Sequence, residues 1–135
     1  MRRPVVVGLL LGYLAVMLGL TLGGFYQPHA ERNFVPFRSM DHDLRAGGRH
    51  LVVNFLGNLG AFLPMGILVP ILAPGGRPAL RVAAASLAFS LGIEVLQGIS
   101  GVRVADVDDV ILNTVGGLAG YGLLLGWRRF RPQKA

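Results

Sequence analysis

The residues able to do chemistry gather in one segment, SLGIEVLQGISGVRVADVDDVILNTVGG, residues 90–117. Carboxylates at this density can transfer protons or hold a hard divalent cation, which prefers oxygen ligands. The chain has no cysteine, so thiolate chemistry is excluded, and no nucleophile with an adjacent base is recognisable in the cluster. The polar residues of the segment are Glu94, Gln97, Arg103, Asp106, Asp108, Asp109 and Asn113.

The elements around this segment have the composition of a membrane protein. The 135 residues are 53% hydrophobic and 15% charged, whereas an ordinary soluble domain has about 25% charged residues. The formal net charge of +6 does not indicate a nucleic-acid partner, because most basic residues flank apolar runs instead of forming a stripe. We predict a single domain, residues 1–135, in contact with membrane lipid.

Four apolar runs are long enough to cross the hydrocarbon core, which needs about 20 residues. They cover roughly 5–24, 51–73, 79–99 and 107–127, with one sizeable loop at 25–50. The first run is too long for a signal-peptide core and lacks a cleavage site, so we predict a retained helix. Pro64 and Pro70 are expected to kink the second span. The predicted fold is all-α, a polytopic four-transmembrane-helix bundle.

The basic residues predict the orientation. Eight of the thirteen Lys and Arg residues lie at the N-terminus, in the 74–81 turn and at the C-terminus, which share one side of a four-span protein. The positive-inside rule then places both termini in the cytoplasm. We expect a multi-pass protein of the cytoplasmic membrane. All seven acids and all three histidines lie toward the opposite, outer face, which indicates function there.

Polar residues within three spans converge at similar depth near that face. Spacings of three and four put each set on one helix face, and a rise of 1.5 Å per residue places Asn58 and Asn113 roughly 10 Å, and Glu94 roughly 7 Å, inside their outer helix ends. This convergence predicts a polar pocket that opens outward. Its candidate residues are Asn54, Asn58, Glu94, Gln97, Arg103, Asp106, Asp109 and Asn113.

We expect different roles for these residues. Amides and hydroxyls in a bundle often only join helices, for about 0.6 kcal/mol, and we favour that role for Asn54, Ser86 and Ser90. An ionisable group inside a span marks a functional site by default, so Glu94 and Asp109 are the catalytic candidates. Asp106 is expected to cap the fourth span. Asp108 falls about 100° off the Asp106/Asp109 face and is expected to be solvated or to act as a cap.

Two other features are read mainly as structural. Small residues in the first span, Gly8, Gly12, Ala15, Gly19 and Gly23, form a ridge suited to helix packing, either within the chain or against another copy. In the 25–50 loop, NFVPF (33–37) forms an amphipathic patch that fits the membrane interface or covers the outer mouth of the bundle. The DHD triplet (41–43) is a weak metal motif, and His29, His42 and His50 are expected to be plain loop residues.

Taken in order, the polar motifs resemble those of the VanZ-like family of small bacterial membrane proteins. The similar pieces are NFVPF, NFLGNLGAFLPMG (54–66), SLGIEVLQ (90–97) and RVADVDDVILNTVGGLAGY (103–121), so the resemblance covers roughly residues 30–122. The resemblance implies an integral membrane protein whose founding relative is associated with teicoplanin resistance. It also implies that the eight candidate pocket residues are the family's characteristic polar positions. It supplies no biochemical mechanism.

Three functions are compatible with these observations. We rank first the binding of a cell-envelope ligand, either a lipid-linked precursor head group or a glycopeptide, with Arg103 as anion contact. The alternative is an intramembrane enzyme acting on a lipid-linked envelope substrate through Glu94, Asp106 and Asp109, either with a divalent cation or with Glu94 as general base. Transport ranks third, because the pocket occupies one face only and no inverted repeat is evident.

Overall fold

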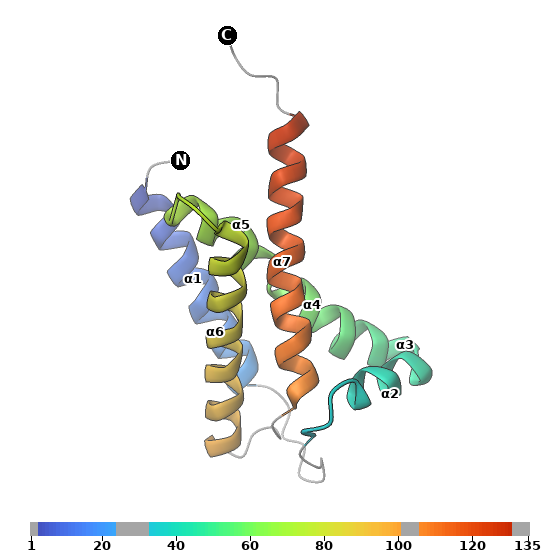
Figure 1. The fold of residues 1–135 in the computed structure, drawn as a ribbon. Helices are drawn as coiled ribbons and strands as arrows, with labels where there is room; N and C mark the ends of the chain where they lie inside the picture. Colours follow the sequence, from blue (N-terminus) through green and yellow to red (C-terminus); the bar gives the residue numbers. More distant parts are fainter. Residues whose placement is uncertain (1–2, 24–32, 101–105, 131–135) are drawn as a thin grey trace.

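The computed structural model describes residues 3–23, 33–100 and 106–130, and every regular element within these ranges is a helix (Figure 1). Four helical stretches are long and apolar enough to cross a membrane: Arg3–Thr21, Gly48–Leu72, Pro78–Ser100 and Val107–Phe130. The first, third and fourth are the uninterrupted helices α1 (Arg3–Leu22), α6 (Pro78–Ser100) and α7 (Val107–Phe130). The prediction of an all-helical protein with four such helices is confirmed.

The second stretch is assembled from several helical pieces. It runs through α3 (Gly48–His50), the π-helical η1 (Leu51–Leu56), α4 (Gly57–Ala61) and α5 (Leu63–Leu72). Pro64 lies in the first turn of α5, where its missing N–H is tolerated, so the chain breaks just before it. Pro70 lies inside α5, which continues past it. Only the first of the two predicted kinks therefore coincides with a break between helices.

The predicted 25–50 loop contains a helix that hydropathy did not reveal. Helix α2 (Arg38–Ala46) is short and mostly polar, so it carries no spanning signal. It ends at Gly47, where the chain reverses through two glycines with positive φ, 59° at Gly47 and 53° at Gly48. Such angles are easily adopted only by glycine. This turn folds α2 back alongside the start of the second span (Figure 1).

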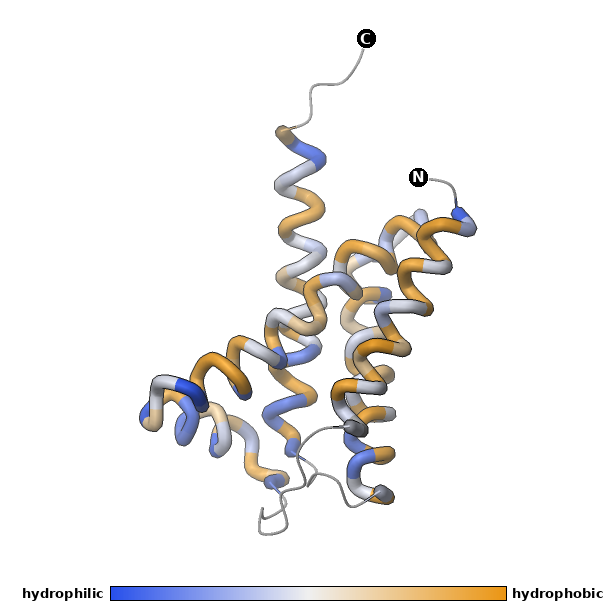
Figure 2. The backbone as a smooth tube through the Cα atoms, turned by 180° about the vertical axis from the view of Figure 1, so that it is seen from behind, coloured by the Kyte–Doolittle hydropathy of each residue, from blue (hydrophilic) through white to orange (hydrophobic). Residues whose placement is uncertain are grey.

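The helix ends are sorted between the two ends of the bundle. The start of α1, the turn between α5 and α6, and the end of α7 lie at the upper end in Figure 1. The end of α6, the start of α7 and helix α2 lie at the lower end. Seen from behind in Figure 2, hydrophilic residues interrupt the lower halves of the helices, and further hydrophilic residues lie at the upper ends of α1 and α7.

The apolar core lies between α1, α5 and α6. Its buried members are Met17, Phe62, Met65 and Ile93. Phe62 is at the break between α4 and α5 and is completely buried. The Tyr13 hydroxyl of α1 donates a hydrogen bond of 2.8 Å to the carbonyl of Ala61 at the same break. Helix α1 therefore packs against the interrupted part of the second span.

Glycines allow the α7 backbone to touch its neighbours directly. A Cβ atom added at Gly116 would lie 2.1 Å from the carbonyl oxygen of Leu59, and one at Gly120 would lie 2.1 Å from that of Leu63. From the other side, a Cβ at Gly66 would lie 2.0 Å from the carbonyl oxygen of Gly117. Helix packing in lipid depends on such close approach because there is no hydrophobic driving force between helices.

The small-residue ridge of α1 faces outward. Gly8, Gly12 and Gly19 are exposed, and a Cβ atom at any of them would meet nothing within 4 Å. The ridge therefore does not pack within the described parts of the chain, and self-association through it stays a prediction. Large apolar side chains such as Leu11, Leu20 and Leu123, exposed by 61%, 70% and 60%, cover the outside of the bundle, as lipid contact requires.

Replacing Gly120 by alanine is expected to destabilise the bundle, because the added methyl group would overlap the carbonyl of Leu63. Overpacking of this kind costs about 1–3 kcal/mol. Gly122→Ala is the matched control: it lies on the same helix and its Cβ would meet nothing within 4 Å. Thermal unfolding of the purified protein in detergent should show a lower midpoint for Gly120→Ala only. Equal midpoints for the two variants would contradict the close approach.

Candidate functional site

Polar side chains from several elements gather at the lower end, around the start of α7. We call this group the carboxylate cluster: Asn33, Ser39, Asn58, Glu94, Asp106, Asp108 and Asp109. Glu94 and Asp109 are each 7% exposed and Asp108 is 1% exposed. Residues from α4, α6 and α7 thus meet with residues that precede or begin α2. The predicted convergence of Asn58, Glu94, Asp106 and Asp109 is present in the structure.

Asp106 caps α7, as expected. Its Oδ1 accepts the backbone N–H of Asp108 at 2.9 Å, which is the usual geometry of a helix N-cap. The same oxygen accepts from the Asn33 amide at 2.9 Å, and Oδ2 accepts from the Ser39 hydroxyl at 2.5 Å. Both carboxylate oxygens are therefore engaged within the protein. This favours a positioning role over a role as metal ligand.

Glu94 connects α6 to this cap. Its Oε2 accepts the backbone N–H of Asp106 at 2.8 Å. The carboxylate therefore lies at the N-terminal end of α7, where the helix dipole favours negative charge. The contact joins two spanning helices that are consecutive in the sequence.

Asp109 faces the second span. Its Oδ1 accepts a very short hydrogen bond from the side-chain amide of Asn58 on α4. Since α4 and α7 also approach through Leu59 and Gly116, this polar contact sits directly beside the close backbone packing. Asp109 is thereby held in a fixed orientation at the end of the bundle.

Asn113 lies one turn deeper. Its amide nitrogen donates to the Ser90 hydroxyl of α6 at 2.8 Å. Its Oδ1 is buried and finds no donor among the described residues, and the same holds for the hydroxyl oxygen of Ser86. Buried polar atoms are nearly always satisfied, so Asn113 Oδ1 is an acceptor available to a water or a ligand group.

Asp108 was expected to be either solvated or a cap, and the structure shows a cap. The side chain is 1% exposed and crosses to a neighbouring segment, which the periodicity of its own helix does not reveal. Its Oδ1 accepts the backbone N–H of Phe37 at 2.5 Å, and its Oδ2 accepts those of Ser39 and Met40 at 2.8 and 3.1 Å. These are the first amides of α2. Asp108 thus caps a different helix from the one it belongs to.

Asn33 and Ser39 are site residues that the sequence analysis missed. Asn33 is 6% exposed, and its Oδ1 accepts the backbone N–H of Val35 at 3.0 Å in a local turn. Its carbonyl accepts the N–H of Val107 at 3.0 Å. The signal was present: Asn33 begins the quoted NFVPF segment, and asparagine often organises turns by bonding the backbone two residues on.

Two further predicted residues, Gln97 and Asn54, make their hydrogen bonds outside the carboxylate cluster. The Gln97 amide donates to the carbonyl of Thr21 at 3.2 Å and joins α6 to the end of α1. The Asn54 amide donates to Asp43 Oδ1 at 3.3 Å. Arg103, the predicted anion contact, falls outside the described residues, and so does His29.

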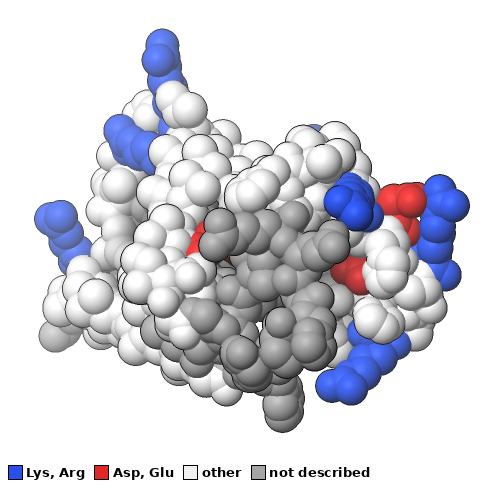
Figure 3. Space-filling view, turned by 90° about the horizontal axis from the view of Figure 1, so that it is seen from below, with Lys and Arg blue, Asp and Glu red and all other residues white. Residues whose placement is uncertain are grey.

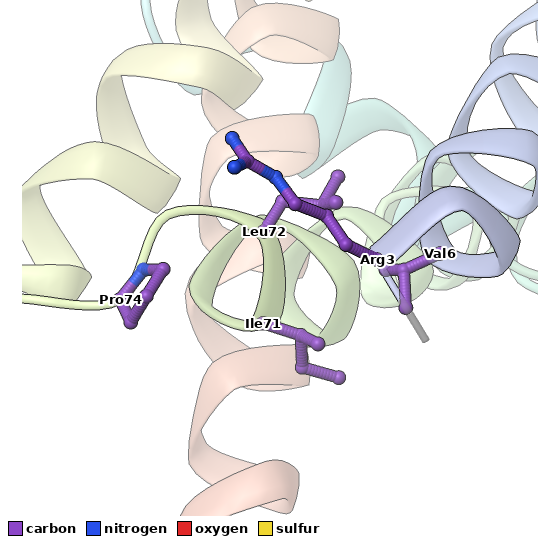
Figure 4. A pocket seen from close by; sticks show the side chains of 5 residues that line it. All are labelled: Arg3, Val6, Ile71, Leu72 and Pro74. Atoms are coloured by element: carbon purple, nitrogen blue, oxygen red, sulfur yellow. The ribbon is translucent and has the colours of Figure 1, made fainter. Parts of the chain in front are cut away.

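The lower end of the molecule is shown in Figure 3. One acidic group comes to the surface toward the middle of this end, other acidic groups lie at its right-hand side beside basic side chains, and the remaining described Lys and Arg side chains lie around the periphery. A separate hollow of about 210 Å³ lies at the upper end, lined by Arg3, Val6, Ile71, Leu72 and Pro74 (Figure 4). Its walls come from α1 and from the end of α5, and none of the predicted site residues lines it.

Removing the Asp108 carboxylate should release the start of α2. In Asp108→Ala, three amides lose a charged acceptor, and hydrogen bonds to charged groups contribute about 1.5–3 kcal/mol. Hydrogen–deuterium exchange across residues 37–40 should become about tenfold faster or more. The control is Asp41→Ala: Asp41 is exposed, pairs with Arg45 at 2.8 Å and raises the pKa of that guanidinium. Unchanged exchange in Asp108→Ala would contradict the capping role.

The comparisons agree with this architecture. The model of the family described as VanZ/LLP1 matches residues 9–128. No curated protein and no solved structure matches the chain. The matched region contains the second and third candidate spans, most of the first and fourth, and the whole carboxylate cluster. The chain is therefore a membrane protein that belongs to the VanZ/LLP1 family.

Proposed function

We propose that this protein lies in the cytoplasmic membrane with both termini in the cytoplasm, and that its carboxylate cluster binds a polar head group of a lipid-linked envelope molecule at the outer face. The distribution of charge supports the orientation. Arg3, Arg77, Arg81, Arg128 and Arg129 belong to the helix ends and turn of the upper end in Figure 1. Basic residues favour the cytoplasmic side.

One observation carries the proposal of a head-group ligand: buried hydrogen-bonding groups from three spans meet beside an exposed apolar patch. Phe34, Val35 and Phe37 precede α2 and are exposed by 70%, 56% and 63%. Asp108 holds the start of α2, and thus the end of this patch, against α7. A ligand with an apolar and a polar part fits such a junction, because aromatic side chains favour the membrane interface.

The chemistry of the cluster indicates which head groups suit it. Glu94 and Asp109 are acceptors, and Asn113 Oδ1 is a further acceptor with no donor among the described residues. Hydroxyl, amide and ammonium groups are donors that satisfy such atoms. Sugars and amino-acid residues attached to a lipid carrier offer these donors. The predicted contact of Arg103 with an anionic part of the ligand belongs to the same proposal.

A second candidate function is acid–base catalysis on the bound head group. It is favoured by the burial of two carboxylates, Glu94 and Asp109, on neighbouring helices. Asp106 is a weaker candidate because hydrogen bonds from Asn33, Ser39 and Asp108 occupy both of its oxygens. Catalysis would therefore rest on the other two acids.

Glycopeptide susceptibility tests the proposal in cells. The wild type and the variants Glu94→Gln and Asp109→Asn would be expressed at equal membrane levels in a teicoplanin-sensitive bacterium. We expect the wild type to raise the inhibitory concentration of teicoplanin and both variants to return it to the value of the empty vector. Asp41→Asn, which removes an exposed carboxylate from α2, should protect like the wild type. Equal protection by all variants would remove the cluster from the function.

Lipid retention separates binding from catalysis. Lipid-linked molecules that co-purify with each protein would be quantified by mass spectrometry. Glutamine can still accept the N–H of Asp106 but carries no charge. If binding is the function, Glu94→Gln should fail to protect and should also retain less lipid. The amount of co-purified lipid should fall by about tenfold, which corresponds to the loss of one charged hydrogen bond. A variant that retains the lipid and fails to protect would instead favour the catalytic alternative.

A further inference from the structure

Two histidines and an aspartate in and after α2 converge: His42 and Asp43 of the DHD triplet are joined by His50. His42 Nδ1 lies 3.5 Å from Asp43 Oδ1, and His50 Nδ1 lies 3.8 Å from the same oxygen. The two imidazole rings meet edge to face with centroids 5.8 Å apart. One ligand atom from each of the three residues lies within 4.8 Å of the others. His42 and His50 lie on helices α2 and α3 rather than in the loop that had been expected.

The backbone brings these side chains together for identifiable reasons. His42 and Asp43 lie on α2, whose start is fixed by Asp108. The positive-φ glycines, Gly47 and Gly48, then reverse the chain, and the N–H of Gly47 bonds the carbonyl of Asp43 at 3.0 Å. This reversal returns His50 to the side of Asp43. The three ligands therefore depend on a short, closed turn rather than on a flexible approach.

The distances favour a shared ion over direct hydrogen bonds. A good N–H···O bond spans about 2.7–3.2 Å, and both His–Asp separations are longer. Two ligands about 2.0–2.2 Å from a tetrahedral zinc ion lie roughly 3.3–3.6 Å apart. The observed 3.5 and 3.8 Å are close to that spacing. Small side-chain rotations therefore suffice to bring all three atoms onto one ion.

The environment of the three ligands also fits a metal. The Asp43 side chain is 11% exposed, while those of His42 and His50 are 70% and 59% exposed, so an ion can enter from solvent. The Asn54 amide donates to Asp43 Oδ1 at 3.3 Å and orients the carboxylate, as outer partners of metal ligands commonly do. Two imidazoles and one carboxylate suit zinc and similar first-row ions.

We propose that His42, Asp43 and His50 form a binding site for a divalent transition-metal ion, with zinc as the best match. Three protein ligands leave a fourth tetrahedral position open, which is the arrangement of zinc sites that hold water or a substrate group. The site is separate from Glu94 and Asp109 and does not rest on the proposed head-group function. It lies at the same end of the molecule as the carboxylate cluster.

Zinc titration of the purified full-length protein tests this proposal. The protein would carry an affinity tag without histidine, be stripped with a chelator and be titrated with zinc chloride in detergent by calorimetry. We expect one ion per chain. His42→Ala, His50→Ala and Asp43→Asn should each weaken binding by about tenfold or more, since even outer partners of metal ligands alter affinity by about 10–100-fold.

A matched variant and a second readout keep the result interpretable. Asp41→Asn removes the same charge from the same helix but affects an acid that pairs with Arg45, so its zinc affinity should equal that of the wild type. Cobalt substituted for zinc should give visible absorption bands in the wild type that His50→Ala loses. Because His42 and His50 are exposed, their variants are expected to elute like the wild type in size-exclusion chromatography. A wild type that binds no zinc, or ligand variants that bind as well as Asp41→Asn, would overturn the proposal.

Discussion

The buried carboxylate of Asp108 joins the polar end of the bundle into one unit. It belongs to α7 but accepts the backbone amides of Phe37, Ser39 and Met40 at the start of α2. The first backbone N–H groups of a helix have no acceptor within that helix, so a charged acceptor beside them is stabilising. This attachment fixes the start of α2 and the end of the exposed apolar patch, and the turn at Gly47 and Gly48 then brings His50 to His42 and Asp43. Asp106 reinforces it through Asn33 and Ser39.

The bonds between Asp108 and α2 require that α7 itself is held rigidly, and the glycines of α7 make this possible. Backbone contacts at Gly116 and Gly120 hold α7 against the interrupted second span. Asn58 and Asp109 lie beside these backbone contacts, so the fixed helix packing places their side chains within hydrogen-bond distance. Apolar residues cannot give this precision in lipid, since lipid chains compete equally well for them. The glycines of α7 thus determine the positions of the carboxylates on the same helix.

Much of the architecture was accessible from the sequence because the bilayer imposes strong constraints. Long apolar runs had to be helices, and helical spacing correctly brought Glu94, Asp109 and Asn58 to one end. The features that were not predicted depend on a reversal of the chain and on contacts between segments that are distant in the sequence. Asp108 was judged from its own helix face, yet its partners precede it by about seventy residues. Helix α2 escaped detection because it is polar, and His50 joins Asp43 only through the turn at Gly47 and Gly48, both of which have positive φ. No periodicity in the sequence encodes these features.

The long separation between Asp108 and its partners also has a consequence for how the protein is made. Phe37 leaves the ribosome 71 residues before Asp108 does, and domains are synthesised from the N-terminus at about 5–20 residues per second. Helix α2 therefore has no cap while the second and third spans enter the membrane. Its final position is fixed only when the fourth helix inserts. The lower end of the molecule in Figure 1 is thus completed last, so a chain interrupted before α7 carries the first three spans but never acquires the complete carboxylate cluster.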